Sequence, residues 1–227
     1  MKVHNVEQRS PEWYKLRLGI PTASEFHNIV GNATGELSRA RGSKTELGEV
    51  AKKYAYRLIA EKLLGHPLEE APGTPWAMAR GKELEPAAIE QYAFTHDVEV
   101  RRVGFVTTDD GRIGCSPDGL IAGARGGVET KCLLDVAHIG LFIDGPDERF
   151  KPQVQGCLAT CELEYWDLHG YHPELPPVTI RTYRDEPYIA KMGAALTEFL
   201  AIRDEMLARA MASGFFANDN VAKAEAA

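Results

Sequence analysis

The stretch GCSPDGLIAGARGGVETKC, residues 114–132, places an acidic residue on each side of a glycine-rich turn. The apolar run on each side of the turn is typical of a short strand, so we expect two neighbouring antiparallel strands here. Proline restricts its own backbone and its neighbour's, which fixes the chain just ahead of Asp118. Residues two apart on a strand share a face, so Glu129 and Lys131 should project together while Thr130 faces the other way.

These side chains allow two interpretations. One is an ordinary sheet edge with solvated acids, because a single acid two positions before a lysine carries little information in a chain with 33 acidic residues. The other is a site for a hard divalent ion, which binds a few carboxylate oxygens, several waters and phosphate oxygens. Asp118, Glu129 and Glu85, the last in a predicted helix, could supply the carboxylates, and the Thr130 backbone carbonyl could join them. Lys131 could then orient or help deprotonate an attacking water and neutralise charge on a phosphate.

Length and composition favour one globular domain. The 227 residues are 44% apolar and 26% charged, and no apolar run approaches the ~20 residues of a membrane span. The N-terminus has no apolar signal core, and the four cysteines do not suggest a secreted disulfide framework. We therefore expect a cytoplasmic protein with free thiols and no membrane partner. We expect a single domain over 1–213 and a flexible tail over 214–227.

The charge distribution bears on possible partners. A net charge of −7 argues, taken alone, against binding nucleic acid. Residues 1–60, however, hold ten lysines and arginines against six acids. A basic N-terminal third joined to an acidic remainder would let one face grip a polyanion while acids elsewhere hold metal.

The order of predicted elements indicates the fold class. We expect helices over 10–19, 22–31 (with Thr22 and Glu25 as a capping box), 43–64, 76–95, 149–162 and 186–212, and strands over 98–106, either side of the glycine turn, 164–170 and 178–183. Helices followed by mostly antiparallel strands with helices interleaved predict an α/β domain built around one mixed sheet.

Five short stretches resemble, in the same order, the phage lambda-type exonuclease family of viral recombinase and alkaline exonucleases, within the PD-(D/E)XK nuclease superfamily. They are WYKLRLGIPTASEF (13–26), RGKELEPAA (80–88), CSPDGL (115–120), VETKC (128–132) and QVQG (153–156), spread over about 140 residues. Each stretch alone is weak evidence for the family, but all five in this order are specific to it. The resemblance implies a restriction-endonuclease-like core, with a central mixed β-sheet flanked by helices.

The resemblance also assigns roles to single residues. Asp118 and Glu129 match the metal-binding acids, Lys131 the catalytic lysine, Glu85 the helix-borne acid and Gln153 the glutamine beside the active site.

A second group, Arg17, Ser24 and Ser116, matches residues that hold a 5′-terminal phosphate in the family. Ser24 falls in the first turn of a predicted helix, where free N–H groups favour an anion, and Arg17 offers a planar fork suited to phosphate. The alternatives are a surface ion pair for Arg17 and a helix-capping role for Ser24. Trp13, in the same stretch, is expected in the core.

The activity implied by the resemblance is a Mg²⁺-dependent 5′→3′ exonuclease, with Mn²⁺ able to substitute. It would degrade one strand of linear double-stranded DNA and leave 3′ overhangs for recombination by single-strand annealing. The resemblance further implies a homotrimeric ring, an annealing protein as partner and a bacterial or phage-infected cell. Two alternatives stay open: an endonuclease (restriction or junction-resolving) with the same metal core, and a non-catalytic DNA-binding assembly protein.

Overall fold

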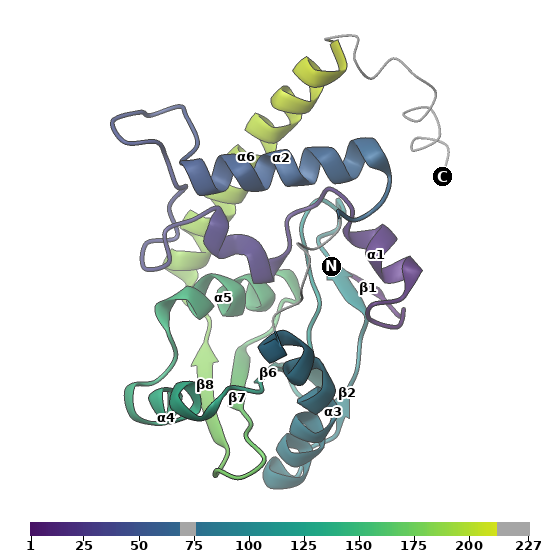
Figure 1. Cartoon of the computed structure of the whole chain (residues 1–227), viewed down its shortest axis with the longest axis vertical. Helices are drawn as coiled ribbons and strands as arrows, with labels where there is room; N and C mark the ends of the chain where they lie inside the picture. The colour runs from purple at the N-terminus through teal and green to yellow at the C-terminus, as the bar shows by residue number, and fades with distance from the viewer. Residues whose placement is uncertain (69–75, 213–227) are drawn as a thin grey trace.

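The computed structural model describes residues 1–68 and 76–212, which form two sheets with helices around them (Figure 1). A small antiparallel sheet has the order β1-β3-β4, from β1 (Lys2–His4), β3 (Phe105–Thr107) and β4 (Gly114–Cys115). The larger sheet has the order β2-β5-β6-β7-β8, from β2 (Val100–Arg101), β5 (Gly119–Ile121), β6 (Gly126–Lys131), β7 (Tyr165–Gly170) and β8 (Val178–Tyr183). Its β6–β7 pair is parallel and its other pairs are antiparallel, which confirms the predicted mixed sheet.

The helices largely follow the predicted order. They are α1 (Pro11–Arg17), the 3₁₀ helix η1 (Ala23–Asn28), α2 (Glu49–Leu64), α3 (Trp76–His96), α4 (Asp135–Asp144), the 3₁₀ helix η2 (Glu148–Phe150), α5 (Lys151–Thr160) and α6 (Glu186–Ala212). The Ser10 hydroxyl caps α1 by accepting a hydrogen bond from the Trp13 N–H at 3.2 Å. Helix α4 was not predicted from the sequence. The predicted tail over 214–227 lies outside the described residues.

Two predictions near the N-terminus are wrong. The helix expected from Thr22 is the single 3₁₀ helix η1, and the Thr22 side chain makes no capping hydrogen bond, so the capping box is absent. The Glu25 carboxylate instead accepts a hydrogen bond from Asn28 Nδ2 at 2.6 Å. The helix expected from residue 43 begins at Glu49, because the Ser43 hydroxyl accepts hydrogen bonds from two following backbone N–H groups and holds a turn.

The strands also differ from the simple alternating pattern. The strand expected over 98–106 is divided between β2 and β3, which belong to different sheets. Two glycines assigned to the turn at 123–127 lie instead in β6. A Cβ atom on Gly127 would come within 2.4 Å of the Trp166 ring, so glycine lets β6 pair closely beside β7.

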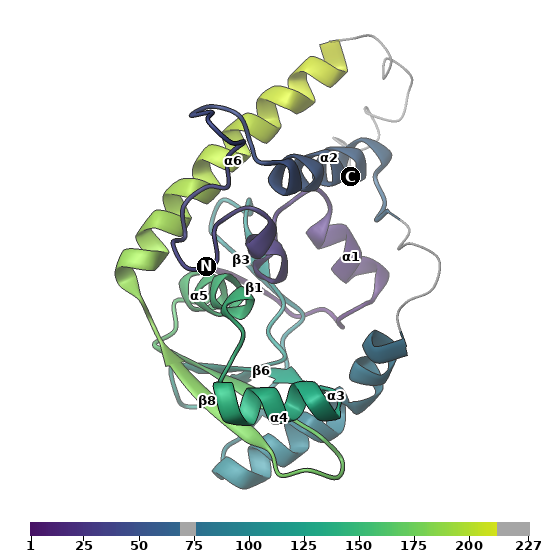
Figure 2. The same ribbon diagram turned by 60° about the vertical axis from the view of Figure 1, so that its left-hand side comes forward.

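The larger sheet lies between two apolar layers, with α5 and α3 on opposite sides (Figure 2). On one side, Ile89 and Tyr92 of α3 pack with Val128 of β6. The opposite layer is the larger core, built from η1, α2, α5, α6 and the other face of the sheet. In this layer α5 lies tightly against η1, since a Cβ on Gly156 would approach the Phe26 ring to 2.6 Å. Strand β6 is the middle strand of the larger sheet, and Lys131 is its last residue.

The cysteines are free thiols, as expected, and three of the four are buried. Within residues 1–68 and 76–212, none of the helices combines the length and the apolar character that crossing a bilayer requires.

Candidate active site

The loop at 116–118 connects β4 to β5 and brings Asp118 to the end of β6. Asp118 Oδ2 accepts a hydrogen bond from the Thr130 backbone N–H at 2.7 Å and another from its hydroxyl at 2.8 Å. The N–H and C=O of a strand residue point towards the same neighbouring strand, so the Thr130 carbonyl also faces the side of Asp118. Gln8 steadies the loop by donating to the Pro117 carbonyl at 2.8 Å.

Glu129, Lys131 and Gln153 form a closed set of contacts beside this loop. Lys131 Nζ donates to Glu129 Oε1 at 2.8 Å, which confirms that the two side chains share a face of β6. Gln153, in the first turn of α5, donates through Nε2 to the same oxygen at 2.7 Å, and its Oε1 accepts from Lys131 Nζ at 3.4 Å. The other glutamine of the QVQG stretch, Gln155, is buried and instead binds the backbone where β8 leads into α6.

The electrostatics of these groups favour a bound cation. Burial, followed by the nearby charge of Glu129, raises the pKa of Asp118 to about 7, although the Thr130 hydrogen bonds oppose the shift. Burial alone would lower the pKa of Lys131, but the charge and hydrogen bond of Glu129 outweigh it, so the pKa is raised and the group is an ammonium ion. Glu129 Oε2 is buried and has no hydrogen-bond partner within the described part of the chain. Two adjacent carboxylates, one with an unsatisfied oxygen, fit a hard cation.

Glu85 of α3 lies near these acids but faces a different partner. Its charge helps to raise the pKa of Asp118, yet its carboxylate accepts a hydrogen bond from Arg9 Nη2 at 2.7 Å and lies 3.9 Å from Arg102. Among the residues that the structure describes, no three acidic, histidine or cysteine side chains are arranged to hold one metal ion. The expected meeting of three carboxylates at a single point is therefore not found, because an arginine holds the third.

A separate cluster joins the three residues predicted to bind phosphate. Arg17 donates to Ser116 Oγ at 3.0 Å and to Thr22 Oγ1 at 3.4 Å, and Ser24 Oγ lies 3.4 Å from that same threonine oxygen. The structure therefore brings Arg17, Ser24 and Ser116 together around Thr22. Thr22 was predicted only to cap a helix, although it lies inside the stretch 13–26 that resembles the exonuclease family.

Arg17 forms no ion pair within the described residues, although the charges of Glu25 and Glu61 act on it. Its guanidinium lies 4.1 Å from the centre of the Trp13 ring, and no carboxylate pairs with it in the described part of the chain. Burial lowers the pKa of Arg17, but a guanidinium stays charged in proteins. The prediction that Trp13 belongs to the core is wrong: it is half-buried, and its Nε1 donates to Ser116 Oγ at 2.9 Å. Its position four residues before Arg17 on one helix is the signal that could have located it.

Arg17 and Trp13 line a cavity of about 440 Å³. Arg9, Arg57 and Lys82 add positive charge to its lining, while Glu25 and Glu61 add negative charge. Ser116 belongs to the cluster around Arg17, and Asp118 belongs to the site with Glu129. The two residues are two positions apart on one loop, so the two sites adjoin.

The chain belongs to the YqaJ-like viral recombinase family, whose domain model matches residues 12–164. The alkaline exonuclease LHK-Exo from Laribacter hongkongensis is 27% identical, with a TM-score of 0.77 over 90% of this chain and 98% of that chain. A structure of LHK-Exo in complex with dAMP gives 26% identity and a TM-score of 0.76 over the same shares. No curated protein matches the chain.

A phage-related exonuclease from Haemophilus somnus 129PT, 17% identical with a TM-score of 0.67 over 84% of this chain and 96% of that chain, shares the fold. The fold is thus the lambda-exonuclease-like PD-(D/E)XK fold. The family and the LHK-Exo likeness support a DNA exonuclease role, in a family of nucleases that are typically metal-dependent.

Proposed function

We propose that the chain is a Mg²⁺-dependent 5′→3′ exonuclease that degrades one strand of linear double-stranded DNA and leaves 3′ overhangs for single-strand annealing. Mn²⁺ is expected to substitute. The observation that carries the proposal is the buried, unpaired oxygen of Glu129 beside Asp118, one short loop away from the unpaired cation of Arg17. A site for a cation next to a site for an anion is what hydrolysis of a phosphodiester near a charged strand end requires.

In this proposal Asp118 and Glu129 would hold the metal, together with the Thr130 backbone carbonyl. Glu85 would join them if its carboxylate were free of Arg9. When bound, a divalent ion would act as a Lewis acid: it would neutralise negative charge on the scissile phosphate and lower the pKa of a neighbouring water.

Lys131 and Gln153 act on the reacting groups. The Lys131 ammonium donates to Glu129 and Gln153 and has one N–H left, which can orient the attacking water, while its charge neutralises charge that develops on the phosphate. The water oxygen bonds to phosphorus as the bond from phosphorus to the 3′ oxygen of the terminal nucleotide breaks, and that oxygen takes up a proton. The shortened strand again carries a 5′ phosphate.

Arg17, Ser24 and Ser116 hold the 5′-terminal phosphate in this scheme. Two residues of chain span at most roughly 7 Å, so the backbones of Ser116 and Asp118 lie no farther apart than that. The terminal phosphate in the first site would then set the next phosphodiester at the second. The dAMP in the LHK-Exo complex, a mononucleotide, is consistent with a mononucleotide product.

The assembly is proposed from the resemblance to lambda-type exonucleases. It consists of a homotrimeric ring around linear duplex DNA and an annealing protein that receives the single strand, in the cytoplasm of a bacterial or phage-infected cell. Each subunit would contribute one nuclease domain over 1–213. Sedimentation velocity of the full chain tests the ring directly.

Time-resolved digestion of labelled DNA tests the activity. We expect Mg²⁺-dependent release of mononucleotides from a 5′-phosphorylated linear duplex, slower release from a 5′-hydroxyl duplex and none from a closed circle. Arg17→Ala should reduce the preference for the 5′ phosphate by about 10- to 100-fold, because a hydrogen bond to a charged group contributes about 1.5–3 kcal/mol. Arg209→Ala, at an exposed position near the end of α6, is the control. Equal cutting of closed circles would establish the endonuclease alternative, and inactivity on all substrates the binding-protein alternative.

A further inference from the structure

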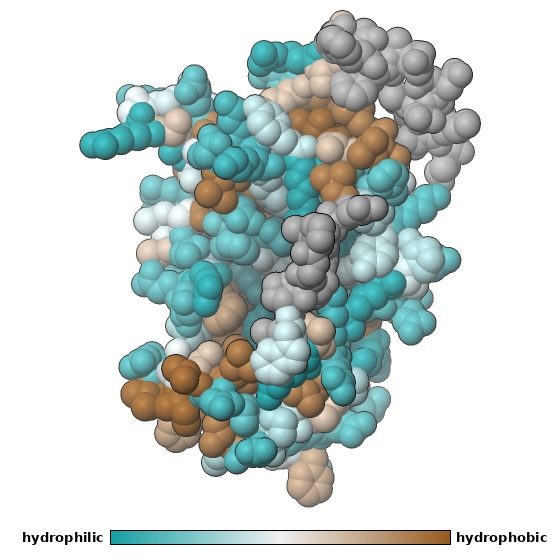
Figure 3. All heavy atoms as spheres, viewed as in Figure 1, coloured by the Kyte–Doolittle hydropathy of each residue, from teal (hydrophilic) through white to brown (hydrophobic). Residues whose placement is uncertain are grey.

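Helix α4 turns an apolar side outward. Two of its ten residues, His138 and Leu141, are buried. The exposed apolar side chains in and next to it are Leu134, Val136, Ile139, Phe142 and Ile143, with exposed fractions of 39, 87, 43, 65 and 71%. We call these five residues the α4 face, and Figure 3 shows the apolar surface over this helix at the lower left. Contiguous exposed apolar surface on a globular protein marks a binding surface more often than isolated apolar residues do.

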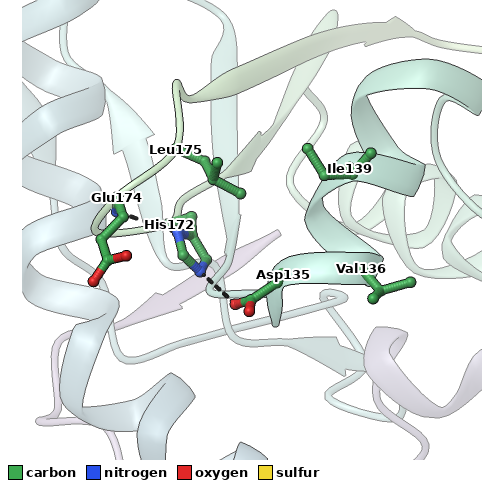
Figure 4. Close-up of a pocket in the computed structure, with 6 residues that line it drawn as sticks. All are labelled: Asp135, Val136, Ile139, His172, Glu174 and Leu175. Atoms are coloured by element: carbon green, nitrogen blue, oxygen red, sulfur yellow. Dashed lines mark hydrogen bonds and ion pairs between the residues drawn. The ribbon is translucent and has the colours of Figure 1, made fainter.

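The α4 face is hollowed at one end. A cavity of about 460 Å³ lies between α4 and the connection from β7 to β8, with Ile139 and Leu175 on opposite sides of it (Figure 4). Its polar wall is fixed, because His172 Nε2 and Asp135 Oδ1 are hydrogen-bonded at 2.9 Å. Glu174 completes this wall. A hollow of this size accepts one large apolar side chain, which is how an anchor residue contributes most of the affinity at an interface.

The residues around the α4 face are mainly acidic. The acids are the exposed Asp135, Asp144, Asp147, Glu148 and Glu174. Two arginines accompany them: Arg149, which is paired with Asp147 at 3.2 Å, and Arg80, which donates to the Cys132 and Leu133 carbonyls beside the start of α4. An acidic rim repels DNA phosphates and anionic lipid headgroups, and it attracts lysine and arginine side chains. The rim therefore selects a basic protein partner.

Gly140 supplies a second indication. It follows Val136 by four residues and precedes Ile143 by three, so it belongs to the same stripe of the helix. A methyl group there would meet nothing within 4 Å, so packing inside the chain does not require glycine at this position. Glycine weakens a helix interior relative to alanine. Its presence leaves room for the backbone of a second helix to approach.

We propose that the α4 face binds a basic amphipathic helix of another protein. The partner helix presents apolar residues at i, i+3, i+4 and i+7, inserts one into the hollow, and places lysine or arginine beside Asp135 and Glu174. Helices α4 and α1 lie on different sides of the molecule (Figure 1), so the bound helix leaves the Arg17 cluster open. A second copy placed with its own α4 face against this one would oppose two acidic rims, which is unfavourable. In the proposed ring, an α4 face at the interface would instead meet a different surface of the neighbouring subunit, and sedimentation of the double variant tests that arrangement.

Fluorescence anisotropy with two synthetic peptides tests the proposal. Both peptides are of roughly five helical turns and carry leucine at the same apolar positions, with lysine at the polar positions in one and glutamate in the other. The full chain should bind the lysine peptide, more weakly at high salt, and should bind the glutamate peptide at least about tenfold less well. The double variant Phe142→Ser with Ile143→Ser should lower affinity for the lysine peptide by about tenfold or more.

Phe94→Ser is the matched control, since Phe94 is an 89% exposed phenylalanine on α3. Equal affinity of the double variant and the control, or equal binding of both peptides, would overturn the proposal. Sedimentation velocity tests whether a second copy of the chain binds the α4 face instead. If the wild-type chain self-associates and the double variant does not, a second copy occupies the face and the proposal is wrong. Nuclease activity on linear DNA should be the same in both variants, so this proposal and the proposed nuclease function fail separately.

Discussion

The hydrogen bond from the Thr130 hydroxyl to Asp118 offers a direct test of the site's electrostatics. Thr130→Val keeps the shape of the side chain and the backbone N–H bond at 2.7 Å, but removes the hydroxyl bond at 2.8 Å. A hydrogen bond to a charged group contributes about 1.5–3 kcal/mol, and one to a neutral group about 0.5–1.5 kcal/mol. Because the pKa of Asp118 is about 7, the loss should depend on pH.

The direction in which the stability contribution of Asp118 changes with pH follows from how tightly the folded and unfolded chains bind its proton. The pKa of Asp118 is about 7 in the folded chain against 3.8 ordinarily, so the folded state holds this proton more tightly and the group's contribution to stability falls as pH rises from about 4 through 7. Removing the hydroxyl raises the folded pKa of Asp118 further, by about half a unit to one and a half units, because a pKa unit corresponds to about 1.4 kcal/mol. We expect Thr130→Val to lower the free energy of unfolding by about 1 kcal/mol near pH 5 and by about 1.5–3 kcal/mol near pH 9.

Urea unfolding followed by circular dichroism, with a chelator present, measures this difference at both pH values. Comparing each variant with the wild type cancels the titration of all other groups. The control is Thr197→Val. The Thr197 hydroxyl donates to the neutral Gly193 carbonyl at 2.9 Å, so the loss of stability in this variant should not vary with pH. A Thr130→Val deficit that is the same at both pH values would refute the assignment of a titrating, buried carboxylate to Asp118.

Three further predictions address catalysis and stability. Lys131→Ala should lower kcat for mononucleotide release by about 10²–10³-fold, and unchanged turnover would exclude the proposed role. Arg181 donates to the fully buried Asp167 at 2.8 and 2.7 Å, so Arg181→Met should lower the free energy of unfolding in urea by about 3 kcal/mol. A loss within experimental error would show that the Tyr92 hydroxyl, which donates to Asp167 at 2.7 Å, is a sufficient partner without the arginine. Burial, and then the charge of His96, lowers the pKa of His169 to about 4. Because the unfolded chain takes up this proton near pH 6.5, the melting temperature should fall on acidification from 6.5 towards 4, and His169→Gln should flatten that slope; an identical slope would contradict it.

The sequence alone identified most of the helices and strands, but not which strands pair with each other or how some helices begin. Periodicity predicted α3, α6, β7 and β8, because each pattern is local and long enough to be distinct. The alternating run over 98–106 looked like one strand, and only the structure shows β2 and β3 in separate sheets. Alternation reports that a segment is extended, and it cannot report which neighbour the segment pairs with. The Thr22 capping box fitted a helix start, but a short 3₁₀ helix satisfies the same residues differently.

Sequence by itself determined the part of the site that depends on short-range geometry. Glu129 and Lys131 share a face because side chains alternate along a strand, and Asp118 reaches Thr130 because β5 and β6 are joined by a tight turn. Only the tertiary structure decided that Gln153 binds Glu129, that Arg17 meets Ser116 from 99 positions away, and that Glu85 pairs with Arg9. A charged side chain pairs with whichever opposite charge the packing brings close, since electrostatic attraction depends on distance in space and carries no record of distance along the chain.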